Sequence, residues 1–254
     1  MQVPLPGGGA VDSGYYAAFS GLLSRSQALD VAASNLANAG TSGYRAERDY
    51  FRSAIVGPDA LDSQLNTTIN NFGVLGGSRL DMDQGAMTPT GNPLDLAIEG
   101  DGFFAVQTPQ GIRYTRDGSF ERAQDGSLTT QAGEPVLDQK HQPIRVPAGD
   151  VHVGSDGGVS VNGALAGRIG VFGFASGDAL SAEGANRYAA SAGSQPVAAT
   201  GAIHQGALEA SNQDVIQGSL QLMLMQRQAE MMQKAVTIFS NDFDKTASED
   251  LPRV

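Results

Sequence analysis

The feature that most constrains the fold of this chain is a heptad pattern over residues 213–243. Apolar residues recur every seven positions there, and a second row follows three positions after the first. No proline interrupts the run, and Gly218 is its only internal glycine. The spacing predicts a long amphipathic helix, because seven residues make close to two helical turns. The seam residues that we expect are Val215, Leu222, Met225, Met232, Val236 and Phe239.

The N-terminal region carries a similar pattern. Its expected seam residues are Tyr15, Phe19, Leu22, Leu29 and Leu36, of which all but Phe19 fall on one heptad position. We expect this helix to end near Asn38, because Gly40 and Gly43 follow it. Narrow apolar seams need a partner. The spacing alone allows two arrangements, a hairpin within one chain and an assembly between chains.

Between the two helical regions the sequence indicates strands and turns. Asp–Gly pairs at residues 101–102, 117–118, 125–126 and 156–157 separate short apolar runs. Such pairs favour β-hairpins, because glycine adopts positive φ without strain. The predicted fold class is therefore α+β. Long N- and C-terminal helices pair as a coiled coil, and a central, mostly antiparallel β domain lies between them.

Composition shifts divide the chain into five predicted segments. Residues 1–12 form a flexible leader, because this stretch holds two prolines and three consecutive glycines. Residues 13–44 form the N-terminal helix and motif of an inner domain. Residues 45–84 form an extended connector and residues 85–205 the central β domain. Residues 206–254 add the C-terminal helix of the inner domain.

Charge and residue usage argue against several function classes. The formal net charge of −11 disfavours binding to a phosphate backbone. The chain has no cysteine, which removes disulfides, thiolate metal sites and cysteine nucleophiles. Its three histidines lack metal-binding spacing, and no nucleophile motif occurs. We therefore expect no catalysis, cofactor, metal, nucleic acid or small-molecule substrate.

The sequence also bears on where the protein works. No apolar run approaches the length of a membrane span, so we expect no membrane insertion. No signal peptide is visible near the first residue. We expect a protein that either stays in the cytoplasm or leaves by a route that reads no cleaved signal.

Six short motifs, taken in order, resemble those of one protein family. They read ASNLAN at residues 33–38, TSGYR at 41–45, TGNPLDLAI at 90–98, EGDGFF at 99–104, YTRDGSF at 114–120 and QGALEASN at 205–212. The set is similar to the signature of the bacterial flagellar rod and hook family. Two positions depart from that signature. Ser34 stands where an asparagine is usual, and Ala229 where an aromatic residue is expected.

The asparagines of the first motif have a physical interpretation of their own. Asn35 and Asn38 lie three residues apart, so they share one helix face beside Leu36. Their amides could hydrogen-bond to backbone groups or to another amide. In the alternative, Asn38 helps to end the helix and Asn35 faces water.

The resemblance implies a structural axial subunit of the flagellar basal body. It implies polymerisation through the terminal helices with other rod subunits and with itself, and export by the flagellar type III apparatus into the periplasmic rod. The short β body resembles that of a proximal rod subunit, and a distal rod subunit is the alternative. A different class of function also stays open, a secreted β-domain binding module with a helical stalk. The motif residues expected to make junction contacts are Asn35, Asn38, Gly43, Tyr44, Leu208, Glu209, Ser211 and Asn212.

Overall fold

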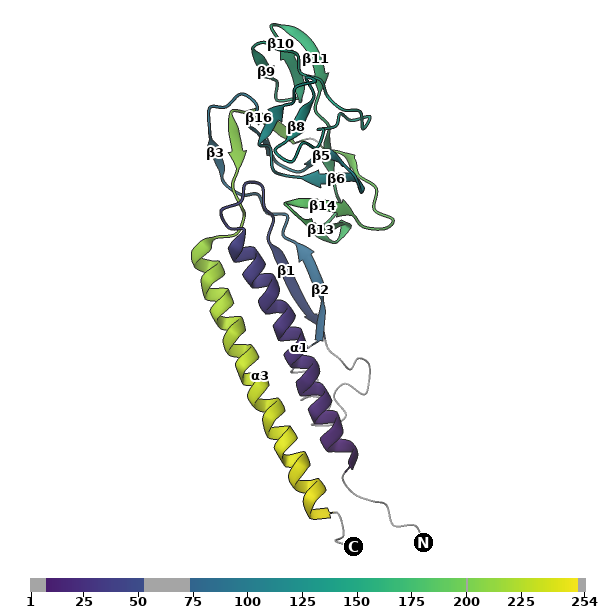
Figure 1. Ribbon diagram of the computed structural model, residues 1–254, viewed down its shortest axis with the longest axis vertical. Helices are drawn as coiled ribbons and strands as arrows, with labels where there is room; N and C mark the ends of the chain where they lie inside the picture. Colours follow the sequence, from purple (N-terminus) through teal and green to yellow (C-terminus); the bar gives the residue numbers. More distant parts are fainter. Residues whose placement is uncertain (1–7, 53–73, 200, 251–254) are drawn as a thin grey trace. The chain divides into compact units, whose positions relative to one another are not determined.

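The computed structural model describes residues 8–52, 74–199 and 201–250. This part of the chain is mostly β-sheet, with helix α1 (Gly8–Ala37) near its start and helix α3 (Val215–Asp250) at its end (Figure 1). The chain divides into two compact units. The first combines the described residues of Met1–Ser34, Asp49–Ser78 and Ile216–Val254, and the second combines Asn35–Arg48 and Arg79–Val215. Among the described residues, neither helix is both long enough and apolar enough to cross a membrane.

The second unit holds most of the strands. Its strands form a six-stranded sheet in the order β13-β14-β6-β5-β12-β15, a three-stranded sheet β11-β10-β9, and the pairs β16-β4, β17-β3 and β7-β8. Neighbouring strands in all of these sheets run antiparallel. A separate pair is formed by β1 (Glu47–Arg52) and β2 (Val74–Leu80). The remaining bounds are β3 (Met87–Pro89), β4 (Leu96–Glu99), β5 (Phe103–Thr108), β6 (Gly111–Thr115), β7 (Phe120–Arg122), β8 (Leu128–Thr130), β9 (Val151–Val153), β10 (Gly158–Val161), β11 (Ala164–Arg168), β12 (Val171–Gly173), the 3-10 turn η2 (Gly177–Ala179), β13 (Leu180–Gly184), β14 (Arg187–Ala190), β15 (Val197–Ala198), β16 (Ala202–Gln205) and β17 (Ala207–Glu209).

The predicted fold class is wrong. The sequence predicted terminal helices that pair as a coiled coil, whereas the described chain is mostly β-sheet and its one N-terminal and one C-terminal helix do not form one.

The residues of α1 explain why the heptad pattern misled us. Its most buried side chains are small, among them Ser24, Ala28 and Ala32, while the predicted seam leucines are only half-buried. Small side chains let another backbone approach closely, and the β1–β2 pair uses this face. The backbone N–H of Leu75 donates a hydrogen bond to the Ser24 hydroxyl at 3.0 Å. The guanidinium of Arg25 lies 4.1 Å from the centre of the Phe51 ring. The first unit therefore covers α1 partly with strands.

Strand β5 organises the core of the second unit. It lies between β6 and β12, and its first four residues are fully buried. Successive side chains of a strand point to opposite faces. Phe104 and Val106 accordingly join one apolar cluster, and Phe103 and Ala105 join another. A strand buried on both faces is a central strand of the fold, and it brings the motif at residues 99–104 into the middle of this unit.

The aspartate of the Asp–Gly pair at residues 125–126 has a turn-forming role. Asp125 Oδ1 accepts hydrogen bonds from the backbone N–H of Ser127 at 3.0 Å and from its hydroxyl at 2.5 Å. The bond from the hydroxyl lowers the pKa of the Asp125 carboxyl. Gly126 has a φ of 83°, which a residue with a side chain rarely adopts. Local hydrogen bonding therefore accounts for this pair.

The predicted segments map onto the structure as follows. Helix α1 begins at Gly8, inside the segment expected to be a leader. Residues 1–7 of that segment lie outside the described residues. Strands β1 and β2 lie in the segment expected to be an extended connector. Residues 53–73 of that segment lie outside the described residues. Strands β3 to β16 fall between residues 85 and 205. The C-terminal segment contains β17 before α3.

Candidate functional site: a buried junction of the terminal motifs

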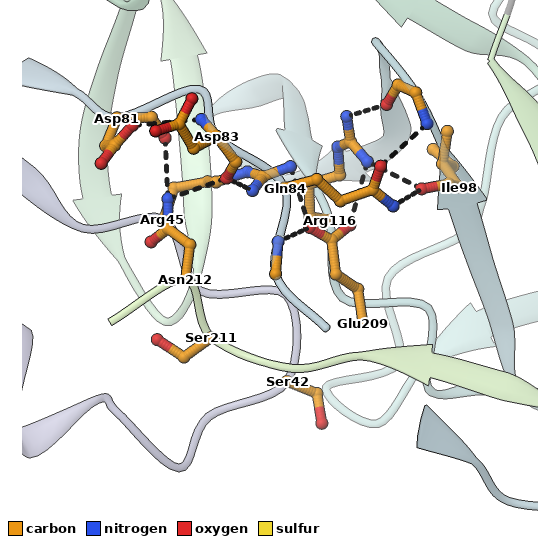
Figure 2. Close-up of polar contacts among 12 residues, drawn as sticks. Ser42, Arg45, Asp81, Asp83, Gln84, Ile98, Arg116, Glu209, Ser211 and Asn212 are labelled. Carbon is orange, nitrogen blue, oxygen red and sulfur yellow. Dashed lines mark hydrogen bonds and ion pairs between the residues drawn. The ribbon is translucent and has the colours of Figure 1, made fainter. Parts of the chain in front are cut away.

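A buried ion cluster joins the N-terminal and C-terminal sequence motifs inside the second unit. Glu209 lies at the end of β17 and is 1% exposed. Its Oε1 lies 2.9 Å from Nη2 of Arg45, and its Oε2 lies 2.9 Å from Nη1 of Arg116. Figure 2 shows both arginines directed towards this carboxylate. One glutamate of the last motif therefore bridges arginines from the second and fifth motifs.

Backbone contacts hold Glu209 in place from two sides. In the pairing of β17 with β3, Glu209 is opposite Met87. The N–H of Gly85 donates to Glu209 Oε1 at 3.0 Å, and the N–H of Gly43 donates to its carbonyl oxygen at 2.7 Å. Gly43 has a φ of 67°, and a Cβ added there would lie 2.3 Å from the carbonyl carbon of Arg116. Only glycine fits this position without moving the backbone.

Arg116 is fixed by carbonyl groups as well as by the carboxylate. Its Nη1 donates to the carbonyl oxygen of Ile98 at 3.0 Å, and its Nη2 donates to that of Gly100 at 2.6 Å. Burial lowers the pKa of Arg116, while attraction to Glu209 opposes this shift and repulsion from Arg45 adds to it. A guanidinium stays protonated even in such surroundings. The site therefore contains two permanent cations and one anion.

Arg45 is held through its backbone and through its side chain. Its N–H donates to the hydroxyl oxygen of Tyr188 at 3.0 Å, and its Nη1 donates to the carbonyl oxygen of Asp83. The Tyr188 hydroxyl in turn donates to Asn186 Oδ1 at 3.2 Å, and Asn186 Nδ2 donates to the carbonyl oxygen of Ser42 at 2.5 Å. Burial raises the pKa of Tyr188 well above its usual range. Strand β14 thus supports the loop that carries Arg45.

The side-chain amide of Asn35 joins the end of α1 to the segment at residues 44–47 by hydrogen bonds. Asn35 is 3% exposed. Its Oδ1 accepts from the N–H of Glu47 at 2.9 Å and from the Tyr44 hydroxyl at 3.1 Å. Its Nδ2 donates to the carbonyl oxygen of Glu47 at 2.8 Å. The Asn35 amide therefore bonds both backbone groups of Glu47, the first residue of β1, as a neighbouring strand would. It does not face water.

The amide of Asn212 joins the C-terminal motif to two other segments. Its Oδ1 accepts from the N–H of Ala46 at 2.7 Å. Its Nδ2 donates to the carbonyl oxygens of Asp81 and Asp83 at 3.1 and 3.0 Å, two contacts that lie beside Arg45 in Figure 2. Its backbone N–H donates to the carbonyl oxygen of Tyr44 at 3.2 Å. One side chain therefore satisfies backbone groups from both the N-terminal motif and the segment before β3.

Three other motif residues make more local contacts. Asn38 Oδ1 accepts a hydrogen bond from the Thr41 hydroxyl at 3.3 Å, just after the end of α1. Ser211 Oγ accepts from the N–H of Gln213 at 3.1 Å, just before α3. Leu208 is half-buried and pairs with Thr88 across β17 and β3.

The predicted seam residues differ in exposure. Phe19 and Val215 are 50% and 57% exposed. The side chains of Tyr15 and Phe239 lie outside the described part of the structure. The other predicted seam residues are half-buried, namely Leu22, Leu29, Leu36, Leu222, Met225, Met232 and Val236.

Sequence reasoning missed the residues that organise this site. Arg45 and Arg116 were quoted only as letters of motifs, because arginine is usually exposed and nothing local marks a buried one. Gln84 was missed as well. Its Nε2 donates to the carbonyl oxygen of Ile98 at 2.8 Å, and its Oε1 accepts from the N–H of Gly100 at 3.0 Å. The available signal was that Arg45 and Arg116 both lie inside motifs that resemble the family signature.

The arrangement is suited to fixing chain segments. The Glu209 carboxylate oxygens all have partners within the protein, and the site is closed to solvent. Within residues 8–52, 74–199 and 201–250, no group of three or more His, Cys, Asp or Glu side chains could hold a metal ion. The geometry of this cluster therefore supports an architectural role.

Comparison with known families defines the class of protein. Residues 97–161 match the family model described as the flagellar hook protein FlgE/F/G D1 domain. Residues 16–45 match the family model described as the flagella basal body rod protein. The two matched regions contain Arg116 and Arg45 of the junction. The chain belongs to the flagellar basal-body rod and hook family, which confirms the resemblance seen in its motifs.

Individual relatives carry the similarity over most of the chain. The sequence is 38% identical over 228 residues to the flagellar basal-body rod protein FlgF of Caulobacter vibrioides, a match that covers 88% of this chain and 92% of the relative. It is 34% identical over 245 residues to the rod protein FlgG of Bacillus subtilis, covering 87% and 93%. It is 33% identical over 219 residues to FlgF of Mesorhizobium japonicum, covering 85% and 88%.

Proposed function

We propose that this chain is a structural, non-catalytic subunit of the flagellar basal-body rod, of the proximal FlgF type. Its relatives are named as rod proteins and match over nearly their whole length. Both FlgF and FlgG occur among them, so the distal FlgG type is the alternative position within the same structure. The observation that carries the structural role is the apolar surface that remains exposed on the two helices.

Helix α3 is apolar on two opposite sides. Leu222, Met225, Met232 and Val236 lie on one side and are half-buried. The other side carries six side chains, all at least half-exposed and spaced to fall on one face of a helix, namely Ile216, Leu220, Met223, Leu224, Met231 and Ile238. An exposed apolar face of this length is typical of an interaction surface.

Helix α1 adds a smaller exposed apolar area. Phe19 and Leu23 are 50% and 54% exposed, although their neighbours Ser24 and Ala28 are buried. In our proposal these surfaces contact helices of neighbouring subunits, both copies of this chain and other rod proteins. The subunit contact is head-to-tail, so that it propagates along a helical assembly without closing into a dimer.

The proposal includes the route to the rod. We infer export from the cytoplasm by the flagellar type III apparatus, without a cleaved signal peptide, and final placement in the periplasmic part of the basal body. The support for this step is the family to which the chain belongs.

The test is complementation of motility in the host bacterium after deletion of its own copy of the gene. Leu222→Asp and Leu224→Asp each place a charge in one apolar side of α3, and burying an unpaired charge in an assembly is costly. We expect both variants to be exported and to fail to build a rod. The matched control is Gln221→Asp, which changes an exposed polar neighbour and should support motility.

The same strains distinguish the alternatives. Rescue of a strain without FlgF, and not of one without FlgG, assigns the proximal position. Normal motility with both leucine variants contradicts assembly through α3. Loss of β structure in the purified Leu222→Asp chain, measured by circular dichroism, contradicts the idea that α3 acts in assembly separately from the β unit. Full function of a monomeric chain would favour a binding module on a helical stalk.

A further inference from the structure

We propose that Glu209 couples the ordering of the N-terminal loop (residues 39–46) to the ordering of the C-terminal segment (residues 207–212), so that the two form or detach as one cooperative unit. The inference concerns the folding of the chain itself. It goes beyond the proposed role in the rod and holds whether or not that role is correct.

The first step of the argument is charge. Arg45 and Arg116 are 1% and 3% exposed, and neither guanidinium can lose its proton. The Nε atoms of both arginines are buried, and neither has a hydrogen-bond partner within the described residues. Glu209 is therefore the main compensation for two buried cations. Without that carboxylate the burial of Arg45 becomes unfavourable, because an unpaired buried charge loses its hydration.

The second step is backbone hydrogen bonding. Three anchors of the N-terminal loop come from the C-terminal segment. The N–H of Gly43 donates to the carbonyl oxygen of Glu209 at 2.7 Å, and the N–H of Ala46 donates to Asn212 Oδ1 at 2.7 Å. The carbonyl oxygen of Tyr44 accepts from the N–H of Asn212 at 3.2 Å. Detachment of the C-terminal segment removes these bonds together with the counter-charge.

The coupling also acts in the other direction. The C-terminal segment pairs with β3, and the N–H of Ala210 donates to the carbonyl oxygen of Ala86 at 2.8 Å. Loss of the N-terminal loop would leave Glu209 with Arg116 as its one cationic partner in this cluster and would leave Asn212 without its bonds to Ala46 and Tyr44. Thermodynamic coupling between two such events is reciprocal. The segments through which the chain leaves for α1 and for α3 are therefore fixed together.

The test is hydrogen exchange of backbone amides in the full-length chain. We expect Glu209→Gln to lower the protection of the Gly43, Ala46 and Ala210 amides by a common factor of about tenfold or more, because the variant keeps the shape and removes the charge. The Leu137 amide, which donates to the carbonyl oxygen of Ala105 in the core, should keep its protection. The matched control is Glu183→Gln, which removes a half-exposed ion pair with Arg113 and should change none of these amides.

Two results would overturn the coupling. One is loss of protection at Ala210 while Gly43 and Ala46 keep theirs, or the reverse. The other is an equal loss in the Glu183→Gln control. If Glu209→Gln fails to fold, Arg45→Met tests the coupling from the other side. The change lies in the N-terminal loop, yet protection of the Ala210 amide should fall, and an unchanged Ala210 amide refutes the proposal.

Discussion

A pair of tyrosines offers a measurement of the hydrogen bonds that one buried hydroxyl makes at the junction. Tyr188 and Tyr114 face each other across β14 and β6, and both are nearly fully buried. The Tyr188 hydroxyl accepts from the N–H of Arg45 and donates to Asn186. The Tyr114 ring packs against Phe172 and Phe174, and its hydroxyl has no hydrogen-bond partner within the part of the chain that the structure describes. Replacement of each by phenylalanine keeps the ring and removes only the hydroxyl.

The two substitutions should have different costs. Tyr188→Phe leaves the N–H of Arg45 buried and unpaired, which costs about 1–3 kcal/mol. Tyr114→Phe removes no bond within the protein, so its effect on the free energy of unfolding should stay within about 0.5 kcal/mol. No cavity arises in either case, because the aromatic ring remains. The difference between the variants therefore measures the two hydrogen bonds of the Tyr188 hydroxyl, one from the N–H of Arg45 and one to Asn186 Oδ1.

The assay is urea unfolding of the full-length chain, followed by circular dichroism of the β signal. At an unchanged dependence on urea, the shift of the midpoint converts directly into a change in the free energy of unfolding. A larger loss in Tyr188→Phe than in Tyr114→Phe is the expected result. Equal losses in the two variants would refute the reasoning, because the hydrogen bonds of the Tyr188 hydroxyl would then contribute nothing measurable.

Three further predictions follow from burial and close approach. Burial raises the pKa of the Tyr188 hydroxyl, so the stability that this group contributes is present in full below its unfolded pKa near 10.0. As the pH rises above that value, the contribution declines by about 1.4 kcal/mol per pH unit. The loss of stability with rising pH should therefore be less steep in Tyr188→Phe, and an unchanged steepness contradicts the assignment. Gly85→Ala places a Cβ 2.0 Å from the Ala210 carbonyl oxygen and should cost about 2 kcal/mol or more, whereas Gly40→Ala meets no described atom within 4 Å and should be nearly neutral in the same urea assay. Phe104→Ala removes a fully buried ring whose centroid lies 5.1 Å from that of the Phe120 ring. The free energy of unfolding, measured in urea, should fall by about 3–5 kcal/mol. A loss below about 1 kcal/mol would mean that this core repacks freely.

Local patterns in the sequence were informative about strands and turns. The sequence predicted strands between the Asp–Gly pairs, and residues 103–106, directly after the pair at 101–102, lie in β5. Asp125 and Gly126 were read as a turn, and the hydrogen bonds of Asp125 to Ser127 make one there. Such features depend on a few neighbouring residues, so a single sequence contains the information needed to predict them.

The packing of the helices was not predictable in the same way. The heptads on Leu22, Leu29 and Leu36 led us to a coiled coil, yet the small residues beside them carry the most buried face of α1. A heptad pattern shows that a helix has an apolar stripe, and it does not specify the partner. Strand β2 contacts part of this face, where the N–H of Leu75 donates to the Ser24 hydroxyl. The local sequence of α1 does not predict that a strand packs against it.

By itself, the sequence determined the family and the presence of one helix near each end of the chain, because these depend on motifs and on local periodicity. Only the tertiary structure decided that Arg45, Arg116 and Glu209 form one buried cluster. These residues are far apart in the chain, and each taken alone reads as an ordinary surface charge. Their burial becomes favourable only when the fold brings the opposite charges within 3 Å of one another and excludes water, which is a property of the assembled structure.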